Sequence, residues 1–116
     1  PNNKDVNRIS SAIYESKGIV SAVCHGNAAL INTTLSDGSL LIKGKRITGF
    51  TNEEESSLGT AKIVPFLLQD KLIERGGVFV EGSAWQENVV IEGRLITGQN
   101  PASAKKVAES IIKQLN

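Results

Sequence analysis

The apolar positions of the chain change their spacing several times, and each spacing predicts a different element. Three apolar side chains at helical spacing predict a helix over residues 5–16, with Gly18 as its stop: Val6, Ile9 and Ile13. Residues 19–23 form a short apolar run rich in β-branched side chains, which predicts a buried strand. Helix formers return at residues 28–30. A strand between two helices is typical of a parallel α/β sheet.

The pattern then becomes more polar. Residues 32–38 are rich in turn-forming side chains and predict a loop. Two short apolar runs, residues 40–42 and 47–51, predict strands on either side of a tight turn at residues 43–45. We interpret the basic side chains around this turn as solvated, rather than as a phosphate-binding site.

The second half of the chain again alternates helix and strand. Residues 64–75 carry an apolar stripe and predict a helix, and residues 78–80 predict a strand. Residues 88–91 and 94–97 predict a hairpin around a two-residue turn, Glu92-Gly93.

One apolar stripe predicts the last helix, with Asn100 as its cap and Pro101 in its first turn: Ala104, Val107, Ala108, Ile111, Ile112 and Leu115. Trp85 lies in the preceding loop, where we expect a packing or lid role rather than a ligand contact. No repeat, low-complexity tract or linker divides the chain, so we expect a single compact unit.

Cys24 stands where the expected strand over residues 19–23 meets the helix that follows it. A side chain on a sharp strand-to-helix turn is the arrangement of a nucleophile elbow, and Gly26 permits the close approach that this turn needs. Because a helix N-terminus favours a thiolate, we expect the pKa of the Cys24 thiol to be lowered. The alternative is a buried structural cysteine that happens to precede a helix. The neighbouring His25 favours the interpretation of Cys24 as a reactive residue.

Three consecutive acids, Glu53, Glu54 and Glu55, open another expected helix. Carboxylates suit the first turn of a helix, and Thr51 or Asn52 can serve as its cap. We expect two of the three acids to be solvated and the third to turn inward.

Composition narrows the function classes. Lys and Arg together number 13 and Asp and Glu 12, a net charge of +1 that gives no reason to expect nucleic acid or a membrane as partner. The single cysteine excludes an internal disulfide and suits a reducing, cytoplasmic compartment. With one Cys and one His, a zinc site would need several carboxylate ligands, so no metal is expected.

Three stretches in this order resemble the ThiJ/PfpI superfamily, which has a class I glutamine-amidotransferase-like fold: residues 20–30 (VSAVCHGNAAL), 43–55 (KGKRITGFTNEEE) and 93–104 (GRLITGQNPASA). The branch that they most resemble is that of the heat-shock chaperones and glutathione-independent glyoxalases (glyoxalase III). The resemblance implies an α/β three-layer sandwich with a mostly parallel, flavodoxin-like sheet. Members are longer than this chain, so residues 1–116 are expected to be the C-terminal part of a single ThiJ/PfpI domain.

The resemblance also implies roles for individual residues. Cys24 matches the nucleophile and His25 its proton-transfer partner, while Glu55, or failing that Glu54, matches the acid that orients the histidine. No metal or organic cofactor is implied. Asn27 departs from the pattern, because the branch usually has proline there. The family's glutamate beside the cysteine and its oxyanion-hole glycine belong to the N-terminal half and have no counterpart in this sequence.

The activity implied by the resemblance is conversion of methylglyoxal to lactate without glutathione, by a lyase. Two other functions stay open, a stress-inducible chaperone or oxidation sensor, and a cysteine hydrolase or deglycase that uses the same residues. The expected partners are a small reactive aldehyde and a second copy of the chain, the missing N-terminal half, or both. Since no strand precedes the helix over residues 5–16, we expect these 116 residues alone not to form a stable, active monomer.

Overall fold

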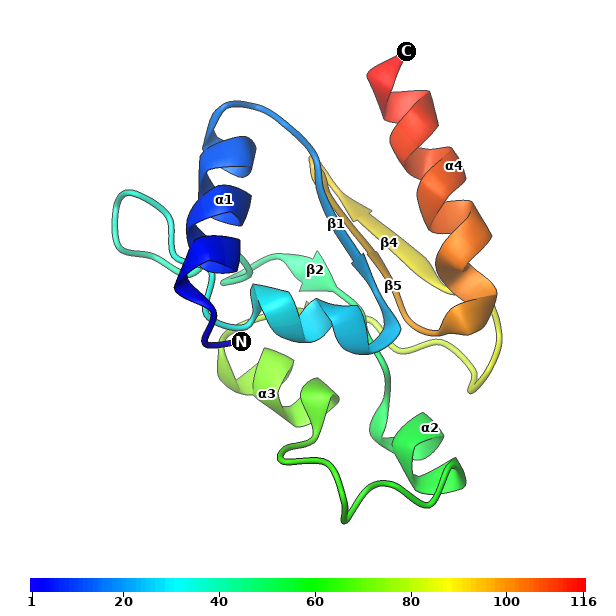
Figure 1. Ribbon diagram of the computed structural model, residues 1–116. Coiled ribbons are helices and arrows are strands. Elements are labelled where there is room, and N and C mark those ends of the chain that lie inside the picture. The colour runs from blue at the N-terminus through cyan, green and yellow to red at the C-terminus, as the bar shows by residue number, and fades with distance from the viewer.

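The computed structural model describes all 116 residues, and its fold is α/β, as the sequence predicts (Figure 1). The elements in chain order are α1 (Lys4–Glu15), β1 (Val20–Val23), the 3-10 helix η1 (Cys24–Leu30), β2 (Arg46–Ile47), α2 (Asn52–Ser57), α3 (Leu68–Glu74), β3 (Val78–Phe79), β4 (Val89–Glu92), β5 (Leu95–Gly98), the short 3-10 helix η2 (Pro101–Ser103) and α4 (Ala104–Leu115). None of the helices has the length and apolar character needed to cross a bilayer.

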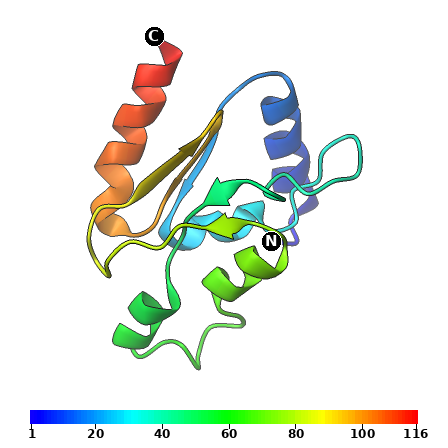
Figure 2. The same ribbon diagram turned by 180° about the vertical axis from the view of Figure 1, so that it is seen from behind.

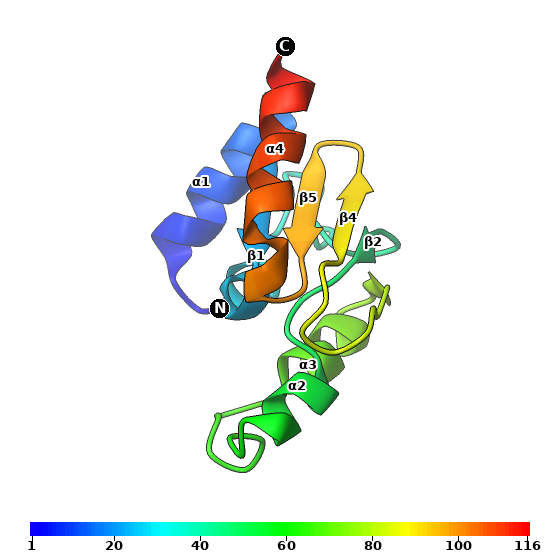
Figure 3. The same ribbon diagram turned by 90° about the vertical axis from the view of Figure 1, so that its right-hand side faces the viewer.

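The strands form a three-stranded sheet in the order β1-β5-β4 and a two-stranded sheet of β2 and β3. β1 pairs in parallel with β5, and β2 with β3, while β4 and β5 form the antiparallel hairpin expected from the sequence. β2 runs beside β4, where the backbone N–H of Arg46 donates to Glu92 Oε1 at 3.0 Å (Figure 3).

The carboxyl ends of the parallel strands β1 and β5 meet at one edge, where Val23 lies opposite Gly98. A Cβ at Gly98 would lie 2.7 Å from Val107 Cγ2, so a glycine is needed where α4 approaches this edge. Figures 1 and 2 show η1, α2 and α3 gathered at the same end of the molecule, with α1 and α4 standing on either side of β1. Open α/β sheets place their sites at such carboxyl ends.

The main core cluster joins η1, β1, β5, α3 and the segment before β2. Its buried members are Val20, Leu30, Ile31, Leu41, Ile42, Ile47, Phe50, Leu68, Leu72 and Leu95. Full burial of one such side chain contributes about 1.5–3 kcal/mol, so this cluster holds the elbow helix η1 against the sheet.

The hairpin predicted around residues 43–45 is wrong. Residues 41–44 form turns, and β2 pairs in parallel with β3 instead of with residues 40–42. Leu41 and Ile42 are fully buried all the same. A short apolar run predicts burial, but it does not distinguish a strand from a buried turn.

Two helices differ from the prediction in extent or type. The helix expected over residues 64–75 begins only at Leu68, because the backbone N–H groups of Ile63 and Val64 turn back to the carbonyl of Thr60. Pro65 also disfavours helical backbone at Val64. The elbow helix is 3-10 rather than α, and Asn100 precedes η2 without a side-chain capping bond.

The end of α1 contains a strained residue that the sequence does not reveal. Lys17 has φ 68°, in the left-handed region, while Gly18 donates its N–H to the carbonyl of Ile13 at 2.8 Å. Gly18 is nevertheless required, since a Cβ there would lie 2.6 Å from Ile13 Cγ2. The left-handed conformation costs a side chain such as lysine about 1–2 kcal/mol.

Replacing Lys17 by glycine is therefore expected to stabilise the chain. The relief of strain exceeds the extra entropy of an unfolded glycine, which leaves a net gain of about 0.5–1 kcal/mol. Thermal unfolding of Lys17→Gly measures it. Lys17→Ala is the matched control, because it loses the same charge and keeps the strain. A Lys17→Gly protein that melts no higher than Lys17→Ala would contradict the assignment.

One face of α1 stays uncovered. Val6, Ile9 and Ile13 are 41%, 47% and 44% exposed, and the helix buries no residue. The three side chains lie at helical spacing, so they form one apolar stripe along the helix.

Candidate active site

Cys24 lies at the turn between β1 and η1, and its backbone is left-handed, with φ 59°. Left-handed backbone is uncommon for a residue other than glycine and is found preferentially at functional sites. The carbonyl of Cys24 accepts hydrogen bonds from Asn27 Nδ2 at 3.1 Å and from the backbone N–H of Phe50 at 3.4 Å. The turn therefore holds the thiol at the carboxyl end of β1.

His25 stands between the thiol and a carboxylate. Its Nδ1 is 3.8 Å from Cys24 Sγ, and its Nε2 is 2.6 Å from Glu55 Oε2. Because a carboxylate only accepts, Nε2 carries a proton toward Glu55, and Nδ1 is the ring nitrogen that faces the sulfur. The histidine side chain is 52% exposed and that of Glu55 is 4% exposed. A buried anion thus orients a base that is open to solvent.

Glu55 is delivered to His25 by the short helix α2. Its other carboxylate oxygen, Oε1, accepts a hydrogen bond from Thr60 Oγ1. Burial raises the pKa of Glu55, but the hydrogen bonds from Thr60 and His25 outweigh burial and hold this pKa below its ordinary value. Glu55 is therefore ionised at neutral pH.

Glu54 is also buried, but its carboxylate does not contact His25. Oε1 accepts from the backbone N–H and the hydroxyl of Thr51, which completes a capping box at the start of α2. Oε2 accepts from the backbone N–H of Trp85 at 2.8 Å and from Asn100 Nδ2 at 2.7 Å. These bonds lower the pKa of Glu54 against the opposing effect of burial.

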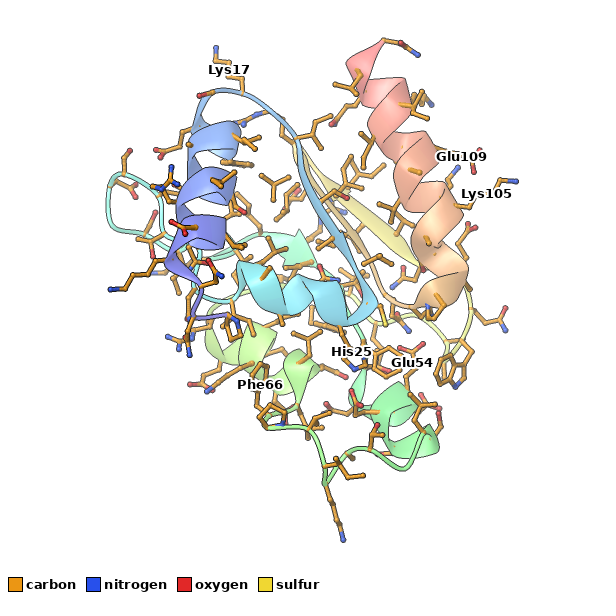
Figure 4. All side chains as sticks on the ribbon, viewed as in Figure 1. Lys17, His25, Glu54, Phe66, Lys105 and Glu109 are labelled. Carbon is orange, nitrogen blue, oxygen red and sulfur yellow. The ribbon has the colours of Figure 1, made fainter.

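Two of the three acids thus turn inward, rather than the single one expected from the sequence. The Thr51-x-x-Glu54 spacing is the signature of a capping box, and it would have assigned Glu54 to the helix cap. In Figure 4 the labelled His25 and Glu54 side chains lie close together between the start of η1 and α2.

An aromatic stack covers one side of the histidine. The rings of His25 and Phe50 lie 4.3 Å apart between centroids, and Phe50 meets Trp85 edge-on at 5.5 Å. Trp85 has a left-handed φ of 62°, and its indole N–H donates to Ser57 Oγ. Trp85 therefore packs against Phe50 beside the site, which agrees with the packing role expected for it.

The lowered pKa expected for Cys24 is wrong for this chain. Burial raises the pKa of the thiol, the backbone N–H of His25 opposes this, and the carboxylates of Glu54 and Glu55 raise it further. The expected lowering depended on the N-terminus of a helix alone, and this helix is of the 3-10 type. The nitrogen of His25 that faces the thiol, Nδ1, lies 3.8 Å from the sulfur.

The raised pKa of the Cys24 thiol can be measured by alkylation. In the folded chain, the labelling of Cys24 by iodoacetamide is expected to rise with a midpoint above about 8.5, the ordinary thiol value. Free glutathione labelled in the same buffers is the control. A midpoint below that of glutathione would show that the field of the helix outweighs burial after all.

The remaining surface near the site offers a cavity and no metal centre. A cavity of about 260 Å³ borders His25 and Gly26 and is closed on the other side by residues of α1, including Val6 and Asn7. No group of three or more His, Cys, Asp or Glu side chains is arranged to hold a metal ion.

A cysteine on a left-handed strand-to-helix turn, beside a histidine that a buried carboxylate orients, defines an α/β protein with a nucleophile elbow. Residues 1–114 match the DJ-1/PfpI family, and the chain belongs to this family.

Two curated relatives carry the name of a glyoxalase. The chain is 43% identical over 120 residues to "Glyoxalase 3" of Candida albicans, covering 97% of this chain and 50% of the relative. It is 38% identical over 121 residues to "Glutathione-independent glyoxalase HSP31" of Saccharomyces cerevisiae, covering 99% of this chain and 51% of the relative. The chain therefore spans about half the length of the curated relatives it matches.

Solved structures of similar sequence have the same fold as this chain. The structure of glyoxalase III from Candida albicans has a TM-score of 0.90 at 41% identity, over 97% of this chain and 50% of the other. Rapid Encystment Protein 24 KDa of Francisella tularensis has a TM-score of 0.97 at 40% identity, over 100% of this chain and 52% of the other.

Proposed function

We propose that this chain carries the reactive site of a glutathione-independent glyoxalase, in which Cys24 is the nucleophile, His25 the general base and Glu55 the acid that orients the histidine. The observation that carries the proposal is the alignment of the three side chains, with Sγ 3.8 Å from Nδ1 and Nε2 2.6 Å from the carboxylate. The names of the relatives support glyoxalase chemistry as the reaction.

The reaction begins with addition of the thiol to the aldehyde of methylglyoxal. His25 Nδ1 takes the proton of Cys24, and the sulfur forms a bond to the aldehyde carbon. The electron pair of the C=O bond moves to oxygen, and the resulting alkoxide takes the proton back from His25, which gives a hemithioacetal and leaves Nδ1 free to act as a base again. The backbone N–H of His25, the residue that follows Cys24, helps to stabilise the negative oxygen.

The second stage moves a proton between the two carbons. His25 removes the proton from the former aldehyde carbon, an enediol forms, and the proton returns to the former ketone carbon. The first carbon is thereby oxidised and the second reduced, so no external oxidant or reductant takes part. The product is a lactoyl thioester of Cys24, and water hydrolyses it to lactate and the free thiol.

Glu55 keeps His25 in the protonation form that both stages need. With its Nε2 proton held by the carboxylate, the ring presents Nδ1 as a base and, after accepting a proton, is stabilised by the adjacent negative charge. The reverse reaction removes water from lactate, so the activity belongs to the hydro-lyases of the lactate dehydratase type.

We also propose that the active unit is larger than these 116 residues. The exposed stripe of α1, Val6, Ile9 and Ile13, is the surface that the complementary half of the domain or a second copy would cover. A cytoplasmic location is proposed on the single free thiol, since reducing compartments preserve such groups.

The test is to express residues 1–116 alone and to measure their mass in solution and the lactate formed from methylglyoxal. We expect association and little turnover. Ile9→Ser should weaken the association, whereas Ile63→Ser, at an isoleucine that is 77% exposed away from the stripe, should not. A fully active, cooperatively folding monomer would refute the proposal of a larger active unit.

The α1 stripe also gives the chaperone alternative its one structural feature, because an apolar surface can bind unfolded chains. Suppression of aggregation that survives Cys24→Ala but is lost in Ile9→Ser would favour this function.

A further inference from the structure

Asn27 lies at the base of the elbow and is fully buried. Its Nδ2 donates to two main-chain carbonyls, that of Cys24 and that of Gly98, each at 3.1 Å. The reversed amide would place its oxygen against both carbonyl oxygens, so the two bonds fix its orientation. Asn27 Oδ1 is buried without a partner. Such an unpaired atom costs about 1–3 kcal/mol, and the two donor bonds must offset this cost.

The two bonds act on the peptide unit that faces the reacting atoms. The Cys24 carbonyl and the His25 N–H belong to one planar group, so holding the oxygen also sets the direction of the N–H. That N–H belongs to the residue directly after Cys24, and its interaction with the thiol acts to lower the pKa of Cys24. The bond to Gly98 adds an anchor at the end of β5, directly opposite Val23 in the paired strand.

The left-handed backbone of Cys24 makes this restraint necessary. A conformation that costs about 1–2 kcal/mol persists only where neighbouring bonds hold it. The Cys24 carbonyl has two donors, Asn27 Nδ2 and the more distant N–H of Phe50 at 3.4 Å. The shorter of the two comes from Asn27.

We propose that Asn27 is a positioning residue, whose side-chain amide holds the Cys24–His25 peptide with its N–H directed at the sulfur and at the oxyanion formed there. The inference rests on the proposed role of Cys24 as nucleophile. It assigns to Asn27 an effect on reactivity that a purely structural asparagine would not have.

The test compares Asn27→Leu with Asn88→Leu. Leucine has a similar size and cannot donate. Asn88 also donates its Nδ2 to buried partners, including the carbonyl of Val80 at 3.0 Å, but does not contact Cys24.

Both variants should lower the melting temperature. The readout is the pH profile of Cys24 labelling by iodoacetamide. The titratable groups that face the sulfur, namely His25 of η1 and Glu54 and Glu55 of α2, are present in both variants.

Asn27→Leu is expected to raise the labelling midpoint by about 1–2 pH units, the equivalent of one hydrogen bond to a charged group. Its kcat should fall about 10²-fold with KM nearly unchanged, as on loss of an oxyanion donor. Asn88→Leu should leave the midpoint where it is. An unchanged midpoint in a folded Asn27→Leu protein overturns the proposal.

A second measurement needs no variant. Scalar couplings across hydrogen bonds, from the Asn27 side-chain nitrogen to the carbonyl carbons of Cys24 and Gly98, should be detectable by NMR in the wild-type chain. Their absence overturns the proposal even if Asn27→Leu fails to fold. The labelling assay uses no methylglyoxal, so a failure of the proposed glyoxalase function is seen separately, as the absence of lactate formation that depends on Cys24.

Discussion

Cys24→Ala is expected to abolish lactate formation from methylglyoxal, with kcat/KM reduced at least about 10³-fold in the form of the protein that turns the substrate over. The chain has no second cysteine that could take the place of Cys24. In the proposed mechanism every later intermediate is carried on the sulfur, so His25 and Glu55 could not compensate for its loss.

The same substitution should cost little stability. Cys24 is only partly buried, and removal of its sulfur leaves the bonds to its carbonyl intact. Lactate assays and thermal unfolding of Cys24→Ala therefore separate chemistry from folding, and Cys24→Ser serves as the matched control of nearly equal size. Turnover retained in either variant would remove Cys24 from the mechanism.

Glu55→Gln should lower kcat by about 10²–10⁴-fold, because it changes the proton arrangement of His25. The amide keeps its oxygen for Thr60 and turns its NH₂ toward Nε2, which must then accept. The ring proton moves to Nδ1, and the face toward Cys24 loses its lone pair. Removing the equivalent charge from a serine-protease triad lowers kcat by about 10⁴-fold for the same reason.

Glu54→Gln is the matched control and should have the opposite profile. Each oxygen of the Glu54 carboxylate accepts two hydrogen bonds, four in all. In Glu54→Gln an NH₂ group would replace one of these oxygens and would then face two donors without an acceptor. The expected loss is about 1–3 kcal/mol of stability, with kcat much less affected. If Glu54→Gln loses turnover and Glu55→Gln keeps it, the two roles are exchanged.

The two acids also make the stability sensitive to acid. The folded-state pKa of each lies below its ordinary value, so the stability that they contribute is complete above about pH 4.3. It is lost as the pH falls through the folded-state pKa. The Glu54→Gln protein should therefore lose less stability than wild type between neutral and acid pH.

The sequence predicts the parts of the site that depend on local order. A β-branched run followed at once by Cys24 and His25 is enough to place a thiol at a strand end. The carboxylate beside His25 is expected only from the resemblance, which matches Glu55 to the acid that orients the histidine. The hairpin of β4 and β5 follows from its turn residues in the same way, although the turn is Gly93-Arg94, one residue later than expected.

The parts that depend on distant segments could not be read from the sequence. The pairing of β2 with β3 joins residues 46–47 to residues 78–79, and no local pattern specifies it. The pKa of Cys24 is raised by burial and by the carboxylates of α2 and lowered by the backbone N–H of His25, and burial and the α2 carboxylates depend on the packing of distant segments. The sequence shows that asparagine stands at position 27 where the branch usually has proline. The hydrogen bond from Asn27 to the Gly98 carbonyl can be seen only in the folded structure, because the two residues are distant in the sequence.

Mass spectrometry of Cys24 during turnover tests the central claim most directly. The reaction is quenched with acid within the first turnover, which preserves a lactoyl thioester, and the peptide that contains Cys24 is weighed. We predict a mass increase equal to one methylglyoxal on that peptide, formed before lactate is released and absent in Cys24→Ser. Lactate that appears while Cys24 stays unmodified at every time point would contradict the account.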